Sequence, residues 1–377
     1  MNFGRISAMT RKEFIHVIRD PRSIILGIAI PVILLLLFAY ALTLDVDHVP
    51  VMVWDQSDSP ASREFISRFK ASRYFKIKGR TDNYRDVEQA IDRGDILAGL
   101  VLPRDFAQRL EARRPVQVQW LVDGSDANTA TIATGYATAV TQAYSEEVVL
   151  QDIRKLTGKV LERPLDVRPR VWFNADMESK NFIIPGLIAV IMMVIAALLT
   201  SLTVAREWER GTMEQLISTP VKGHELIIGK LTPYFIIGMF DVLLAVLMGK
   251  FQFGVPLRGS VVLLFGMAAV FLLGALSLGL LISIFTKNQL LANQLALLTT
   301  FIPAFVLSGF AFPINSMPKV VQWVTFLVPA RFLVHLFKGI YLKGVGLETL
   351  YLEAGLLALF AVAMVGLTLV KFKKKLE

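Results

Sequence analysis

Residues 205–225, with the sequence AREWERGTMEQLISTPVKGHE, gather charged side chains between two long apolar runs. These side chains are Arg206, Glu207, Glu209, Arg210, Glu214, Lys222 and Glu225. Carboxylates and cations so close together can form ion pairs and charge-assisted hydrogen bonds, within the chain or with another protein. The segment is therefore a candidate for recognition of a partner. The alternative is a solvated loop whose cations anchor the neighbouring spans.

Catalytic motifs are missing from the rest of the sequence. There is no cysteine, which excludes disulfides and thiolate chemistry, and the four histidines lie far apart without a metal-binding pair. Neither Gly-x-Ser-x-Gly nor His-Glu-x-x-His occurs, so a hydrolase has little support. The nearest approach to a nucleotide site, GHELIIGKLT, has wrongly spaced glycines and Leu231 where a P-loop needs Ser or Thr. We expect no catalytic residue, metal or cofactor in this chain.

Polar residues inside apolar runs are the second set of candidates. Asp241 lies well within such a run, where a carboxylate is costly unless it is paired or hydrated. It could contact a cation, a proton or a substrate, or it could hydrogen-bond to a neighbouring helix. Further candidates for a substrate path could equally hold membrane helices together. They are Asn293, Gln294, Thr299, Thr300 and Ser308.

Most of the elements that must position these residues are membrane spans. The mean hydropathy is +0.55, and runs of about 18 or more apolar residues indicate transmembrane helices. We predict a polytopic α-helical membrane protein with six transmembrane helices and both termini in the cytoplasm. The predicted spans are 23–44, 182–204, 226–249, 260–285, 290–312 and 351–370. The net charge of +9 concentrates before the first and after the last span, so it reports topology and predicts no nucleic-acid partner.

The segments that flank the spans also have predicted roles. Residues 1–22 form a cytoplasmic amphipathic helix, with apolar residues from Phe3 to Val17 at near-helical spacing. Pro31 should kink the first span, and 372–377 are a basic cytoplasmic tail. Prolines break residues 313–345, so this region should be re-entrant within a transmembrane domain of residues 181–371. Ala39-Tyr40-Ala41 could be a signal-peptidase site, but in either case the residues after Leu44 are exported.

Residues 45–180 are predicted to be an extracytoplasmic α/β domain inserted between helices 1 and 2. Strands are expected at 50–55, 74–78, 96–103 and 116–123, and helices at 59–70, 83–94, 104–114 and 127–156. Asp123, Ser125 and Asp126 in this domain could form a catalytic or metal cluster, but a turn followed by a helix N-cap explains them more simply.

The charged segment itself should contain a short helix. Gly211 is expected to end the helix that leaves the membrane, and Thr219-Pro220 to end the next helix. Between them, Thr212-Met213-Glu214-Gln215 has the form of a capping box. The prediction is a short helix on the membrane surface, joined to two spans.

Three stretches resemble one family, the ABC-2 type permeases, which are the membrane subunits of a class of ATP-binding-cassette exporters. AREWERGTMEQLISTP resembles their cytoplasmic segment, FIIPGLIAVIMMVIAALLTSLTVARE their second span, and LSGFAFPINSMPKVVQWVTFLVPARF the stretch after their fifth span. The resemblance covers essentially the whole chain. The long exported loop is similar to that of the drug-efflux-like branch.

This resemblance implies that 205–225 includes a coupling helix that docks in a cleft of a separate ATPase subunit, which binds ATP and Mg²⁺. The implied coupling residues are Arg206, Glu207, Glu209, Arg210, Gly211, Thr212, Glu214, Leu216, Thr219 and Pro220. Two permeases, identical or paralogous, would export an amphipathic or lipid-like substrate, drugs included, across a bacterial inner membrane. A periplasmic adaptor and an outer-membrane channel could extend the path. The competing hypothesis is a membrane-anchored receptor with an exported ligand-binding domain.

Overall fold

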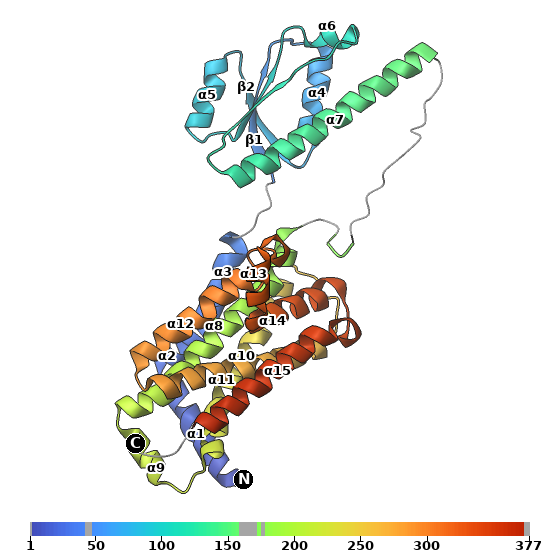
Figure 1. Cartoon of the computed structure of the whole chain (residues 1–377). Coiled ribbons are helices and arrows are strands. Elements are labelled where there is room, and N and C mark those ends of the chain that lie inside the picture. The colour runs from blue at the N-terminus through green and yellow to red at the C-terminus, as the bar shows by residue number, and fades with distance from the viewer. Residues whose placement is uncertain (1, 42–46, 158–171, 175–177, 373–377) are drawn as a thin grey trace. The chain divides into compact units, whose positions relative to one another are not determined.

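The computed structural model describes residues 2–41, 47–157, 172–174 and 178–372, which divide between two compact units (Figure 1). The first unit comprises Met1–Thr43 and Arg170–Glu377 and is helical, whereas the second, Leu44–Pro169, has both strands and helices. The predicted basic tail lies outside the described residues except for Phe372, as do residues 42–44 of the predicted first span.

Five helices in the described part of the helical unit are long and apolar enough to cross a membrane. They are α8 (Ser179–Glu209), α10 (Gly223–Phe251), α11 (Val261–Thr286), α12 (Gln289–Leu307) and α15 (Leu347–Lys371). Each overlaps a span predicted from hydropathy. Helix α8 is at the centre, packed against α10, α11 and α12, and 89% of its most apolar window is buried. A helix that is apolar all round its surface is expected to be buried in this way.

The predicted first span is less regular than expected in the residues that the structure describes. Its apolar helical part, Ile25–Ala41, has 17 residues. The irregularity expected at Pro31 lies one turn earlier, where the N–H of Ile30 bonds to the carbonyl of Ile25 in a π-helical turn. Because proline clashes with the carbonyl four residues before it, a widened turn at this point accommodates the ring. The elements are α2 (Pro21–Ile24), η1 (Ile25–Ala29) and α3 (Ile30–Ala41).

The proline-rich region is a sharply bent helix pair. Lys319–Leu327 and Pro329–Lys343 meet at 92°, the geometry of a broken span or of a re-entrant loop. The guanidinium of Arg331 stabilises the bend, because it lies 3.8 Å from the ring centroid of Phe326 and donates to the carbonyl of Gln322 at 3.2 Å. The elements are η2 (Ile314–Ser316), α13 (Lys319–Val324), η3 (Thr325–Leu327), α14 (Pro329–Lys338) and η4 (Gly339–Lys343). The described helices thus give five spans, or six if the bent pair counts as one.

The N-terminal helix α1 (Phe3–Arg19) packs along α10. The sequence predicts one apolar face for this helix, but the structure buries only part of it. Met9 and Val17 are buried, whereas Phe3 and Phe14 are exposed. A Cβ on Gly229 would lie 2.7 Å from Met9, so the glycine permits this close approach of the two helices. Glu13 is buried in the same contact.

The second unit has a four-stranded sheet in the order β2-β1-β3-β4. Strands β1 (Val49–Asp55), β2 (Phe75–Arg80) and β3 (Ala98–Leu102) are parallel, and β4 (Gln119–Val122) is antiparallel to β3. The helices are α4 (Pro60–Ala71), α5 (Tyr84–Asp92), α6 (Phe106–Glu111) and α7 (Ala127–Thr157). All of these elements lie within a few residues of the ranges predicted from the sequence.

Alternation along the strands separates the two faces of this sheet. Val51 and Val53 contribute to a core with α4, α6 and α7, whereas Met52 and Trp54 pack with α5. Since successive strand residues point to opposite faces, the α/β unit has helices on both sides of its sheet. Helices α4 and α5 connect β1 to β2 and β2 to β3, in opposite directions along the sheet. Their positions on opposite faces are those that right-handed crossovers require.

Candidate functional site

The charged segment is a helix, a tight turn and a second helix. Helix α8 ends at Glu209, and Gly211 has a φ of 69°, a left-handed conformation that glycine adopts without strain. Helix α9 (Thr212–Ser218) follows, and the extended backbone at Thr219 ends it. The short helix and both of its boundaries therefore match the sequence prediction.

The predicted capping box at the start of α9 is wrong. The N-cap is Gly211, which has no side chain, and Thr212 is already helical. The hydroxyl of Thr212 instead donates to the carboxylate of Glu207, one turn back in α8. The left-handed turn at Gly211 shifts the helix start by one residue and frees Thr212 for this contact.

Helix α9 has two distinct faces. Met213 is 1% exposed and belongs to an apolar cluster with Met9, Leu226 and Phe372, and Leu216 packs against the same cluster. On the other side, Glu214, Gln215 and Ser218 are exposed. Apolar contacts thus fix the helix to the spans while its polar face remains accessible.

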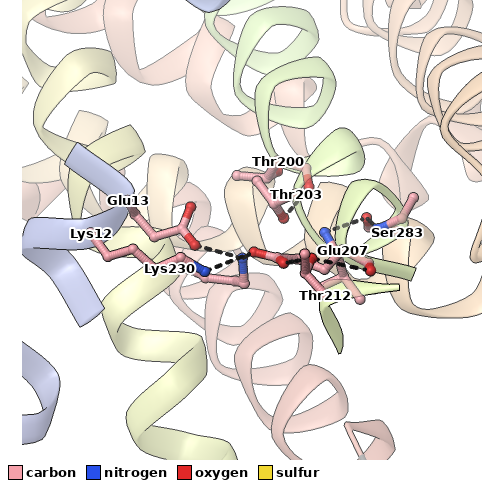
Figure 2. Close-up of polar contacts among 10 residues, drawn as sticks. Lys12, Glu13, Thr200, Thr203, Glu207, Thr212, Lys230 and Ser283 are labelled. Carbon is pink, nitrogen blue, oxygen red and sulfur yellow. Dashed lines mark hydrogen bonds and ion pairs between the residues drawn. The ribbon is translucent and has the colours of Figure 1, made fainter. Parts of the chain in front are cut away.

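Beneath α9 lies a cluster of four charged side chains from three helices, of which Lys12 is exposed and the other three are buried (Figure 2). The ammonium of Lys230 on α10 is 2.7 Å from Glu13 Oε1 on α1 and 3.3 Å from Glu207 Oε1 on α8. Lys12 Nζ is 3.1 Å from the same Glu207 oxygen. Lys230, Glu13 and Glu207 are 1%, 2% and 7% exposed. We refer to these four residues as the ion cluster.

The ion cluster balances two carboxylates with two ammonium groups. A buried charge is tolerated only when it is paired and hydrogen-bonded, so the buried members Glu13, Glu207 and Lys230 depend on one another. Because Glu207 also accepts from Thr212, the cluster joins α1, α8 and α10 to the start of α9. A displacement of α9 therefore acts on a contact shared by four helices.

Sequence reasoning assigned Glu207 to the charged segment but missed Glu13 and Lys230. A signal for Glu13 was present, because it is the only acidic residue among the basic residues of 1–19. Lys230 lies near the start of an apolar run, where a lysine usually extends toward the membrane surface. The structure instead buries it between two carboxylates.

The remaining predicted coupling residues fall into two groups. Arg206 pairs with Asp20 at 3.2 Å, and Glu209 accepts from the backbone of Gln289 at 2.7 Å. In contrast, the exposed side chains of Arg210 and Glu214 have no ion pair or hydrogen bond with any residue that the structure describes. The turn that follows is held by two bonds: Thr219 Oγ1 donates to the Leu216 carbonyl at 2.6 Å, and Arg5 donates to the Pro220 carbonyl at 2.6 Å.

Asp241 faces a small cavity of about 30 Å³ between α3, α8, α10 and α11. Its Oδ1 is buried and has no hydrogen-bond partner among the described residues. The lining is largely apolar and includes Leu35, Met192 and Tyr234. A cavity above roughly 10–15 Å³ can hold a water molecule, which could satisfy this oxygen.

The polar residues of α12 lie away from Asp241, since none of them lines its cavity. Thr300 and Ser308 are buried, and Thr300 Oγ1 donates to the Ala296 carbonyl at 2.6 Å. Asn293, Gln294 and Thr299 are exposed. Thr299 and Thr300 line a different groove, of about 610 Å³, whose other walls come from α8, α14 and α15. The predicted substrate-path residues are therefore not brought together: Asp241 lines one cavity and Thr299 and Thr300 another, and the other three line neither.

The acidic turn of the α/β unit is explained by local hydrogen bonds. Asp123 Oδ1 accepts from the N–H of Ser125 at 2.9 Å, and Asp126 Oδ1 from that of Asn128 at 3.1 Å. The backbone of Ser125 lowers the pKa of Asp123, and the hydroxyl of Thr129 lowers the pKa of Asp126. Within the described residues, no group of three or more His, Cys, Asp or Glu side chains could hold a metal ion.

Comparison with known proteins places the sequence among membrane transporter subunits. A family model described as ABC-2 family transporter protein matches residues 21–370. The chain is 39% identical to the "Probable multidrug ABC transporter permease YbhS" of Escherichia coli (strain K12), over 100% of this chain and 99% of that protein. It is 29% identical to "Probable multidrug ABC transporter permease YbhR" of the same organism, over 93% of each chain. It is also 24% identical to that strain's "Inner membrane transport permease YhhJ", over 86% of this chain and 85% of that one.

Proposed function

The chain belongs to the ABC-2 family of transporter proteins, and from this premise we propose that it is the permease subunit of an exporter driven by a separate ATPase. The two relatives named as probable multidrug permeases support export of amphipathic molecules, drugs included. The apolar groove of about 610 Å³ beside α12 suits such a substrate or a lipid-like one. The ATP and Mg²⁺ would be bound by the ATPase, and two permeases would enclose the path.

The outward face of α9 is the proposed contact with the ATPase. Arg210 and Glu214 are exposed and unpaired among the described residues, while Met213 anchors the helix from below. Charges arranged in this way are available for complementary ion pairs with a partner, which give specificity and orientation. Arg206, Glu207 and Glu209 act differently, since each already has a partner within the chain. They would pass the motion of α9 to the spans.

The membrane arrangement we propose has six spans: the helix of Ile25–Ala41 together with α8, α10, α11, α12 and α15. The bent pair would then be a re-entrant loop at the outer face. Both termini and α9 lie in the cytoplasm, and the α/β unit lies outside a bacterial inner membrane. Its position would allow docking of a periplasmic adaptor. Asp241, in its separate cavity between α3, α8, α10 and α11, would give the path a second, polar or protonatable contact.

The observation that carries the proposal is an anchored short helix with an unpaired, charged outer face. To test it, the tagged chain is purified from native membranes in mild detergent and the proteins that accompany it are identified. We expect an ATP-binding-cassette subunit that is largely lost when Arg210→Glu and Glu214→Lys are combined. The matched control is Glu348→Lys, an exposed charge at the start of α15. If no ATPase accompanies the wild-type chain even after crosslinking, the exporter assignment is wrong.

A further inference from the structure

The α/β unit contains a cleft for which the transport scheme gives no role. Two adjoining cavities, of about 410 Å³ and about 1000 Å³, lie between α7 and residues 113–120. They share the lining residues Val116, Val118, Thr141 and Ser145. We call the two together the α7 cleft. Its volume is in or above the usual range for small-molecule sites, roughly 300–1,000 Å³.

One end of the α7 cleft is apolar. Phe65, Phe106, Leu110 and Val148 line the smaller cavity, so side chains from α4, α6 and α7 contribute to one wall. Val149 continues this wall to the surface and is 53% exposed. Among residues 47–155, whose side chains the structure describes, Val149 is the one large apolar side chain that is exposed. Within these residues, the unit thus leaves a large apolar side chain exposed at this cleft alone.

The mouth of the same cavity carries an unbalanced positive charge. Arg113, Arg114 and Asp152 line it, and Arg113 Nε is 3.3 Å from Asp152 Oδ2. This pair leaves Arg114, whose exposed guanidinium has no partner in the part of the chain that the structure describes. Arg113 has a φ of 55°, at a helix end where glycine is usual. A strained arginine and an unpaired arginine therefore meet at the rim of an apolar hollow.

The larger cavity extends the cleft toward the other end of the sheet. Gln56 and Pro103, which directly follow β1 and β3, line it together with Trp120. Ligands of open α/β sheets bind outside the carboxyl ends of parallel strands, where the strand order reverses. In this sheet the order reverses beside β1. The N-terminus of α4 at this edge is already capped, because the N–H of Ser62 donates to Ser59 Oγ at 3.1 Å.

We propose that the α7 cleft binds an amphipathic organic anion, with its apolar part against Val148 and Val149 and its acidic group on Arg114. A guanidinium forms charge-assisted hydrogen bonds with carboxylate or phosphate oxygens, and the apolar wall removes the rest of the molecule from water. In a longer ligand, the part that does not fit the smaller cavity would occupy the larger one. The binding does not depend on the proposed transport, and a chain without any ATPase partner would have the same site.

The test is equilibrium binding of a dansyl-labelled undecanoic acid to the full-length chain in lipid nanodiscs, with empty nanodiscs as the background. Unlabelled undecanoate is the competitor, and the corresponding dansyl-labelled alcohol is the uncharged probe. We expect saturable fluorescence enhancement with the acid. Removing the guanidinium in Arg114→Ala should weaken binding of the acid about tenfold, and that of the alcohol little. The control is Arg104→Ala, an exposed arginine that does not line the cleft.

A second variant locates the site independently of Arg114. Val149→Asp places a carboxylate on an exposed position of the apolar wall, so it should fold normally and weaken binding of both probes about tenfold or more. The proposal is overturned if the signal only follows the amount of lipid, or if saturable binding is the same in wild type and Val149→Asp. An equal loss in Arg104→Ala and Arg114→Ala would also overturn it, because general surface charge would then explain the effect.

Discussion

Lys230 illustrates how one buried side chain organises the site. Its ammonium lies between Glu13 and Glu207, and each of these carboxylates is less than 10% exposed. A buried ion pair contributes little net stability by itself, but removal of one partner leaves an uncompensated charge. The role of Lys230 is therefore to make the joint between α1, α8 and α10 specific.

Replacing this lysine gives a prediction at the scale of one residue. Lys230→Met should destabilise the chain by about 3 kcal/mol or more, because two carboxylates lose their shared cation in a dry site. Lys12→Met is the matched control, since Lys12 also contacts Glu207 but its side chain is 47% exposed. Loss of such an exposed pair should cost about 1 kcal/mol or less. Thermal unfolding of the purified variants measures both, and equal losses would contradict the description of the cluster.

At the scale of the element, the turn at Gly211 sets the direction of α9. In Gly211→Ala the added Cβ would meet no atom within 4 Å. The backbone φ of 69° at this position, however, is unfavourable for alanine by about 1 kcal/mol or more. Part of this strain should be relieved by a rotation of α9, so we expect about fivefold weaker retention of the ATPase. Gly266→Ala is the control, because it also has open space but lies inside helix α11. Unchanged retention in Gly211→Ala would show that the turn does not orient the docking face.

The elements also show what a sequence can and cannot predict. Hydropathy places α8, α10 and α11 because each helix must be apolar over a membrane thickness, which is a local property. The same reasoning finds α9, because Gly211 and Thr219-Pro220 end helices locally. It misses the pair of Glu13 and Lys230, which are 217 residues apart. It places an irregularity at Pro31, but the form of this irregularity, a π-turn over the preceding residues Ile25–Ala29, is seen only in the structure.

Across the whole molecule, the structure distributes two kinds of polar site over two units. The helical unit holds the ion cluster and the outward face of α9, whereas the α/β unit holds the α7 cleft. Because the chain belongs to the ABC-2 family, we propose that the outward face of α9 in the helical unit contacts an ATPase partner. The central claim of this account is therefore that α9 contacts the ATPase.

Site-specific crosslinking tests this claim most directly, and because this sequence has no cysteine, one introduced thiol is the only site labelled on this chain. Glu214→Cys and Glu348→Cys are each labelled with a maleimide benzophenone and irradiated in native membranes. Both positions are exposed, but Glu348 lies beyond the kink at Leu350, and the helix from there to Lys371 near α9 is about 32 Å long. We predict an adduct with an ATP-binding-cassette subunit from Glu214→Cys and none from Glu348→Cys. Adducts of equal yield from both positions, or none from Glu214→Cys, would contradict the account.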